Sequence, residues 1–203
     1  MSKKKRIGIL LSGRGTNFEA IAASVAAGRI PNAEIAVVIS NRGGALGIES
    51  AKLRGLEALV ISSKGKERPA HDAEVVAALK EKKVDLVCLA GYMRLLSPWF
   101  VQQFPQRILN IHPALLPAFA GLEAQKQAFD QGVKVSGCTV HLVDEQLDHG
   151  AIVVQRTVPV LDTDDEHTLA ARILEQEHIA YTEAINLVLS GKCKVVGRRV
   201  LTK

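Results

Sequence analysis

The sequence of 203 residues has few aromatic residues, few cysteines and no long apolar run, and each shortage excludes a class of protein. Phe, Trp and Tyr make up 4% of the chain, and no basic stretch is rich in them, which argues against a surface that stacks nucleic-acid bases. No apolar run approaches the roughly 20 residues that a membrane-spanning helix needs. No signal-peptide pattern precedes the first apolar run, so we expect a cytoplasmic protein that does not bind membranes.

The three cysteines, Cys88, Cys138 and Cys193, are scattered and form no Cys-x-x-Cys pair. This pattern is typical of thiols in a reducing compartment rather than of a disulfide framework. The chain also lacks the His, Cys and Asp spacing of a zinc site, so we expect no metal.

The residues that are abundant indicate a soluble globular protein, with 47% hydrophobic and 23% charged residues. The formal net charge is +5, but many basic residues lie in residues 3–6 and 192–203. Basic ends are usually solvated tails, so the charge does not favour a nucleic-acid partner. An apolar helix face can belong to a core or to an interface, which leaves a monomer and a homodimer both open.

Apolar runs typical of strands buried on both faces alternate with segments of helical spacing through the first half of the chain. The expected strands are 6–12, 33–40, 56–61, 84–90 and 107–111, and the expected helices are 18–27, a segment ending near 52, and 70–82. Such alternation builds a doubly wound parallel sheet flanked by helices.

The second half of the chain predicts an antiparallel edge and a long final helix. Residues 135–143 and 151–158 have the partial polar alternation of an antiparallel pair. Thr163 and Glu166 fit a capping box at the start of the last helix, which Gly191 ends. The prediction is a single α/β domain, residues 1–203, with an N-terminal half of about 1–100 that binds phosphate and a C-terminal half of about 101–190 that is catalytic.

A glycine loop, Ser12–Asn17 (SGRGTN), follows the first expected strand. In a doubly wound sheet this turn lies where helix N–H groups bind anions. A dinucleotide fingerprint would need a third glycine where Phe18 stands, and the loop lacks the lysine of a P-loop. A cradle for one phosphate fits better, and a merely structural turn is the alternative.

Asn110 and His112 lie two residues apart at the end of a buried strand, so their side chains project to the same side. Asn110 offers an N–H donor for a polarised carbonyl oxygen, and His112 offers a proton near neutral pH. Asp148 lies in the turn between the two later strands. If the three converge, Asn110 and His112 hold an oxyanion while Asp148 orients the histidine and assists proton transfer. The alternatives are a structural histidine and an ordinary turn aspartate.

Four motifs in register resemble the glycinamide ribonucleotide formyltransferases, a folate-dependent family of purine biosynthesis. They are SGRGTN (12–17), LAGYMRLLSP (89–98), NIHPALLP (110–117) and LDHG (147–150). The resemblance runs nearly end to end, and it implies that 10-formyltetrahydrofolate donates a formyl group to the amine of glycinamide ribonucleotide without a metal. It also implies a Rossmann-like formyltransferase fold.

Residue roles carried over from this resemblance are implied in the same way. Asn110, His112 and Asp148 match the catalytic trio, and Gly15, Thr16, Asn17 and Glu177 match the residues that bind glycinamide ribonucleotide. The residues that match the folate pocket of the family are Arg68, Met93, Arg94, Leu95, Leu96, Asn110, Val143 and Leu147.

Two departures from the family pattern concern acceptor binding. The family often has Ser where this chain has Ala114, and Pro-Gly-Leu-His where it has residues 120–123, Ala-Gly-Leu-Glu. Methionyl-tRNA formyltransferase and formyltetrahydrofolate hydrolase share related motifs, but we expect each to need a further domain for which this chain has no room. A non-catalytic nucleotide- or folate-binding module is the alternative from a different class.

Overall fold

The computed structural model describes residues 3–202 and divides into two compact units, one ending at Leu109 and the other beginning at Asn110. This division falls close to the boundary near residue 100 that the sequence predicts between its two halves. That the halves form a single domain stays a prediction.

The first unit is built on four parallel strands in the order β3-β2-β1-β4. Their bounds are β1 Lys5–Leu11, β2 Ala33–Ser40, β3 Ala58–Val60 and β4 Leu86–Leu89. The central strand β1 buries five consecutive residues from Ile7 onward, which is why the sequence there is an unbroken apolar run.

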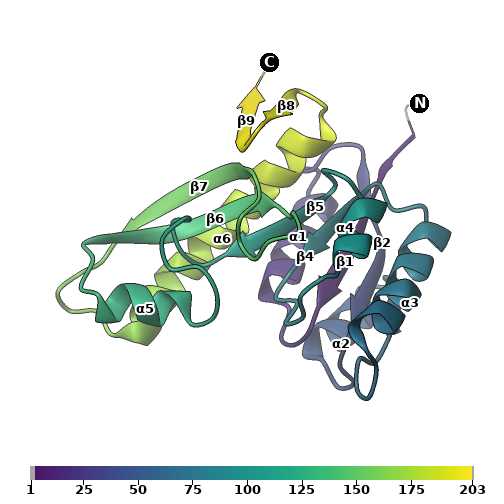
Figure 1. The fold of residues 1–203 in the computed structure, drawn as a ribbon, viewed down its shortest axis with the longest axis horizontal. Coiled ribbons are helices and arrows are strands. Elements are labelled where there is room, and N and C mark those ends of the chain that lie inside the picture. The colour runs from purple at the N-terminus through teal and green to yellow at the C-terminus, as the bar shows by residue number, and fades with distance from the viewer. Residues whose placement is uncertain (1–2, 203) are drawn as a thin grey trace. The chain divides into compact units, whose positions relative to one another are not determined.

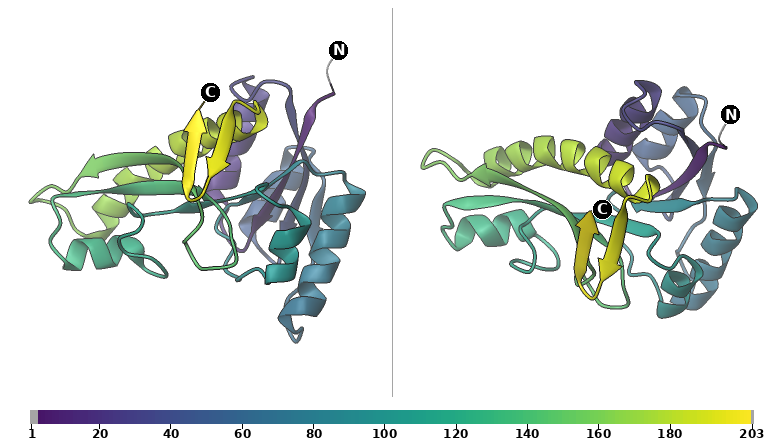
Figure 2. Two further views of the ribbon diagram at one scale, coloured as in Figure 1. Left: turned by 45° about the horizontal axis from the view of Figure 1, so that its top comes forward. Right: turned by 90° about the horizontal axis from the view of Figure 1, so that it is seen from above.

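Four helices flank this sheet: α1 Thr16–Ala26, α2 Leu46–Leu53, α3 Arg68–Glu81 and α4 Pro98–Gln103. Helix α1 packs with α2 and α3 packs with α4, and the two pairs lie on opposite faces of the sheet (Figures 1 and 2). The sequence did not predict α4, which has six residues and is too short for a helical period. It begins where the Ser97 hydroxyl accepts a hydrogen bond from the Phe100 N–H and Pro98 takes the first helical position.

Strand β5 (Ile108–His112) passes along the chain from the first unit into the second. The second unit contains β6 Val135–Leu142, β7 Ile152–Pro159, β8 Cys193–Val196, β9 Arg199–Thr202, α5 Ala124–Asp130 and α6 Glu166–Leu189. The expected antiparallel pair is confirmed as β6 and β7, and α6 packs along both (Figure 1).

Two predictions about the C-terminal part are wrong. Helix α6 is capped by Asp165, whose carboxylate accepts from the Thr168 N–H while the Thr168 hydroxyl accepts from the Asp165 N–H. Thr163 lies too early to reach the first turn of a helix that starts at Glu166. The basic C-terminus is the hairpin β8–β9 rather than a solvated tail, because Gly197 takes a positive φ of 59° and turns the chain.

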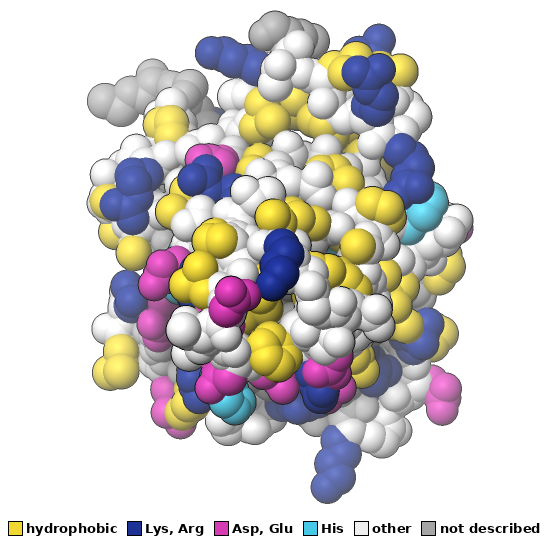
Figure 3. Space-filling model, turned by 90° about the vertical axis from the view of Figure 1, so that its left-hand side faces the viewer, with side chains coloured by type: hydrophobic (Ala, Val, Ile, Leu, Met, Phe, Trp, Pro, Cys, Tyr) yellow, Lys and Arg dark blue, Asp and Glu magenta, His cyan; other side chains and the backbone are white. Residues whose placement is uncertain are grey.

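The predicted fold class is confirmed: a mainly parallel sheet flanked by helices, with antiparallel strands in the C-terminal half. Within residues 3–202, none of the helices combines the length and apolarity needed to span a membrane. On the face shown in Figure 3, basic and acidic side chains are interspersed among apolar ones.

Candidate functional site

Asn110 and His112 occupy alternate positions on β5, so both side chains leave the strand on the same side. His112 is 4% exposed and Asn110 is half-buried. A histidine at this depth needs partners for both ring nitrogens, because an unpaired buried polar atom is costly.

Asp148 supplies one of these partners. It lies in the loop between β6 and β7 with a left-handed backbone, φ 48°, which aspartate tolerates better than most residues. Its Oδ2 lies 3.3 Å from His112 Nδ1 and also accepts a hydrogen bond of 2.9 Å from the Gly121 N–H. The structure therefore brings together an imidazole and a carboxylate that are 36 positions apart along the chain (148 − 112).

The second ring nitrogen of His112 also has a partner. His112 Nε2 lies 2.7 Å from the carbonyl oxygen of Phe119. Because a carbonyl can only accept, Nε2 carries a hydrogen and donates it. Any substrate oxygen that takes a hydrogen bond from Nε2 must replace the Phe119 carbonyl as the acceptor.

A second histidine, His141 on β6, joins the same cluster and was missed in the sequence. It is 2% exposed, and its Nε2 lies 3.2 Å from Asn110 Nδ2 and 3.7 Å from Asp148 Oδ1. Its Nδ1 lies 3.0 Å from the Leu142 carbonyl, so Nδ1 carries a hydrogen. In the neutral ring, Nε2 accepts from the Asn110 amide and fixes which way that amide points, whereas in the protonated ring the Nε2–H group faces the Asp148 carboxylate.

The sequence did contain a signal for His141. Thr139 and His141 share one face of β6, and the Thr139 hydroxyl donates to the Ala114 carbonyl and accepts from the Leu116 N–H. Thr139 and His141 are thus polar residues at alternate positions of a strand that leads into the loop of Asp148. Such a pattern indicates the face of β6 that contacts the segment after β5.

The charges around Asp148 keep it ionised. Burial by itself raises the pKa of this carboxyl group, but the interaction with His141, the hydrogen bond from the Gly121 N–H and the charge of His112 lower it. The result is a pKa below the usual 3.8. A carboxylate that stays charged can orient an imidazolium and attract a proton.

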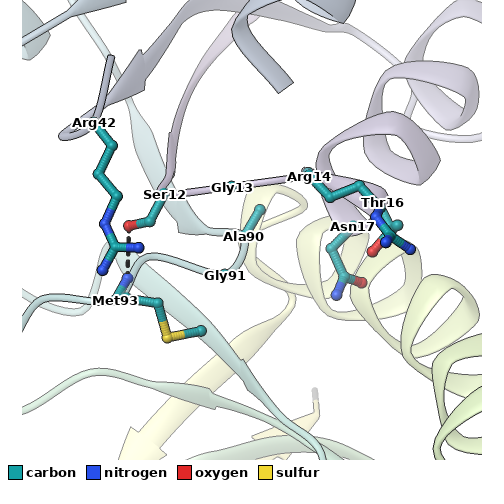
Figure 4. A pocket seen from close by; sticks show the side chains of 10 residues that line it. Ser12, Gly13, Arg14, Thr16, Asn17, Arg42, Ala90, Gly91 and Met93 are labelled. Carbon is teal, nitrogen blue, oxygen red and sulfur yellow. Dashed lines mark hydrogen bonds between the residues drawn. The ribbon is translucent and has the colours of Figure 1, made fainter. Parts of the chain in front are cut away.

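The glycine loop forms a pocket of about 220 Å³ in the first unit. Gly15 has φ 80° and precedes α1 without a side-chain cap, so the positive end of the helix dipole lies at this loop and favours an anion. Figure 4 shows Arg14 beside Thr16 and Asn17, and Arg42 on the side of Met93. Two guanidinium groups and a helix N-terminus make this pocket suitable for a phosphate.

Residues 5–185 match the family model described as "Formyl transferase". The chain belongs to the formyl transferase family. It is 47% identical over 93% of its length to the trifunctional purine biosynthetic protein adenosine-3 of Drosophila melanogaster, and spans 14% of that protein. It is 40% identical to the phosphoribosylglycinamide formyltransferase of Haemophilus influenzae, over 94% of this chain and 90% of that one.

A solved structure agrees with this membership. The crystal structure of glycinamide ribonucleotide transformylase 1 from Symbiobacterium toebii matches with a TM-score of 0.96 and 50% identity, over 100% of this chain and 95% of that chain. The resemblance of the sequence to folate-dependent formyltransferases is therefore confirmed at the level of the family.

The other residues expected to bind substrates in this formyl transferase have contrasting environments. Arg68 is exposed at the start of α3, and Met93, Leu95 and Leu147 are 60%, 49% and 56% exposed. Arg94, Leu96 and Val143 are half-buried. Glu177 on α6 is only 5% exposed. A glutamate on a helix is usually solvated, so its burial is unusual.

The two departures from the pattern of this formyl transferase family lie near the cluster. Ala114 is fully buried, and its carbonyl accepts from Thr139. The segment 120–123 carries Gly121, whose N–H binds Asp148, and ends at Glu123, which has a left-handed backbone and precedes α5. The changed residues therefore flank a direct contact with the cluster.

Proposed function

We propose that the chain transfers the formyl group of 10-formyltetrahydrofolate to the amine of glycinamide ribonucleotide. The products are formylglycinamide ribonucleotide and tetrahydrofolate, in de novo purine biosynthesis. The observation that carries this proposal is the contact between His112 and Asp148 beside Asn110. The names of the relatives support the same reaction.

The proposed reaction is direct attack of the acceptor amine on the formyl carbon. A new C–N bond forms, the carbonyl oxygen becomes an oxyanion, and the bond from the formyl carbon to N10 of the folate then breaks. The proton lost by the amine ends on the folate nitrogen, so atoms and charge balance. Asn110 and His112 stabilise the oxyanion, and Asp148 assists the proton transfer, directly or through water.

The Phe119 carbonyl gives this mechanism a structural basis. It accepts the hydrogen bond that His112 Nε2 donates. A formyl oxygen is also a carbonyl oxygen, so it can accept the same hydrogen bond. Donor binding exchanges one acceptor for the other without leaving a buried N–H unpaired. The exchange becomes favourable as the formyl oxygen gains charge in the transition state.

The substrate contacts that we propose come from the resemblance to the family, and the glycine-loop pocket supports those of the acceptor phosphate. Gly15, Thr16 and Asn17 hold the acceptor phosphate, and Glu177 binds the acceptor as well, in our proposal at its ribose. The donor lies against Arg68, Met93, Arg94, Leu95, Leu96, Asn110, Val143 and Leu147. We propose that the enzyme uses no metal, acts in the cytoplasm and is a monomer or homodimer.

The test is a direct assay of the purified chain with 10-formyltetrahydrofolate and glycinamide ribonucleotide. The proposal predicts one tetrahydrofolate released for each formylated acceptor, with turnover unchanged by a chelator. Tetrahydrofolate release without the acceptor would indicate a hydrolase, and formylation of methionyl initiator tRNA would indicate the tRNA enzyme. Binding of either substrate without any turnover would indicate a non-catalytic module.

A further inference from the structure

The segment Gly91–Ser97 joins β4 to α4 in the first unit and forms neither helix nor strand. It exposes Met93 and Leu95, the apolar side chains that we assign to the donor pocket. A segment without a helical or strand hydrogen-bond ladder holds its side chains in place only through other contacts.

The segment donates three hydrogen bonds to its surroundings, and its Gly91 carbonyl accepts a fourth, of 3.1 Å, from the Ser12 N–H. The Met93 N–H donates to the Ser12 hydroxyl at 2.8 Å, and Arg94 Nη2 donates to the Lys66 carbonyl at 3.2 Å. The Ser97 N–H donates to Asp72 Oδ2 at 2.7 Å. The last is the shortest of the three and the only one of them that has a carboxylate as its acceptor.

Asp72 lies on α3 and is fully buried. A buried carboxylate loses its hydration, and an apolar residue of similar size would pack the helix at lower cost. Its other oxygen, Oδ1, has no hydrogen-bond partner among the described residues and lies 3.9 Å from His71 Nδ1. The His71 ring is fixed from its other side, where Nε2 donates to the Ile61 carbonyl at 2.9 Å.

The segment itself brings further polar groups to this carboxylate. Tyr92 has a buried hydroxyl with no hydrogen-bond partner in the part of the chain that the structure describes. Burial raises the pKa of Tyr92, and the negative charge of Asp72 raises it further, while Arg94 opposes the change. The charge of Asp72 therefore influences Tyr92, while its direct contact with the segment is the hydrogen bond from the Ser97 N–H.

We propose that Asp72 is a positioning residue for the donor side of the site: its carboxylate, anchored on α3, holds the segment Gly91–Ser97 so that Met93 and Leu95 present an ordered apolar wall to the reduced folate. Asp72 touches neither substrate. This inference rests on the proposed function, because it assigns the exposed side chains of the segment to the folate.

A purely structural role for Asp72 makes a different prediction. Ser97 also caps α4, so Asp72 could do no more than fix the start of that helix. In that case its loss lowers the stability of the fold and affects both substrates alike. A positioning role affects the donor far more than the acceptor, because only Gly91 and Met93 of the segment also line the glycine-loop pocket.

The experiment compares Asp72→Ala and Asp72→Asn with the wild-type chain and with Val75→Ala. Val75 is fully buried on the same helix, so its truncation destabilises α3 without touching the contact with Ser97. The Michaelis constants for 10-formyltetrahydrofolate and glycinamide ribonucleotide are measured with kcat, well below the melting temperature of each variant.

For Asp72→Ala we expect the Michaelis constant for the donor to rise about tenfold or more, because a charge-assisted hydrogen bond is lost. The turnover number and the acceptor constant should stay within about threefold. Asp72→Asn keeps an oxygen that accepts from Ser97, so it should recover most of the loss and leave a rise of about two- to fourfold. Val75→Ala should leave both constants near the wild-type values.

Equal changes for donor and acceptor, the same donor effect in Val75→Ala, or no donor effect in either Asp72 variant would overturn the inference. If Asp72→Ala does not fold, Asp72→Asn carries the test alone, and an unchanged donor constant contradicts the inference. Calorimetric binding of tetrahydrofolate separates the two proposals. A wild-type chain that binds tetrahydrofolate without formyl transfer refutes the proposed reaction, whereas weaker binding by the Asp72 variants still supports the positioning role.

Discussion

Replacing His141 with alanine tests the part of the site that the sequence did not reveal. The imidazole is 2% exposed, and it fixes the Asn110 amide through a contact of 3.2 Å while lying 3.7 Å from Asp148. Its removal leaves the Asn110 amide without its ring partner, so the amide can rotate away from the oxyanion that we propose it binds.

The expected magnitude follows from that one contact. Leaving a fully buried polar group without its partner costs about 1–3 kcal/mol, which corresponds to about 5- to 150-fold, and because Asn110 is half-buried we expect the lower part of this range. The amide acts on charge that develops only in the transition state, so the loss should appear in kcat while both Michaelis constants change by less than about threefold. His141→Gln, which keeps a polar side chain at this position, should recover part of the activity.

The assay is steady-state release of tetrahydrofolate, with urea unfolding of each variant measured alongside. Val140→Ala is the matched control, because Val140 is fully buried on β6 and neighbours His141. This control should lose stability and keep kcat. If His141→Ala is folded and its kcat stays within about threefold of wild type, His141 does not orient Asn110, and our reasoning about the cluster is wrong.

Three further predictions concern the rest of the site. Asp148→Asn should lower the free energy of unfolding at neutral pH, because the native pKa of Asp148 is depressed. The difference from wild type should shrink as the pH falls below about 4 and through that pKa, and a difference that grows in acid contradicts this. Thr16→Ala or Asn17→Ala should raise the Michaelis constant for glycinamide ribonucleotide about tenfold with little change in kcat, and an unchanged constant means that the loop is structural. Gly150→Ala places a Cβ 1.8 Å from the Leu142 carbonyl oxygen, so urea unfolding should show a loss of about 1–3 kcal/mol, and an unchanged stability would refute the close approach.

Much of the fold could be predicted from local patterns. The apolar runs of β1 and β2 arise directly from burial on two faces. The polar residues of β7 reflect its partly exposed position, whereas β6 is buried from Ser136 to Leu142 and its polar residues are buried as well. Helices α4 and α5 were not predicted from the sequence, because six and seven residues are too few to show a helical period. The β8–β9 hairpin was not predicted, because its basic residues suggested a solvated tail. In the structure Gly197 forms the turn between the two strands.

The site was predictable to the extent that its residues carry a local signal. Asn110 and His112 lie at the end of a buried strand, and Asp148 lies in a turn, so each is a candidate by position. The contacts with the Phe119 carbonyl and with His141 depend on how the loops fold back, which no local pattern encodes. The buried contact of Asp72 with Ser97 spans 25 positions and is equally invisible in the sequence.

The central claim is that an amide, an imidazole and a carboxylate act together on one formyl carbon. The most direct measurement is kcat of His112→Ala with both substrates saturating, on protein shown to be folded by its unfolding curve. The account predicts a fall of about 10²- to 10⁴-fold, the usual contribution of a general acid–base group. A folded variant that turns over within about threefold of the wild-type rate would contradict the account.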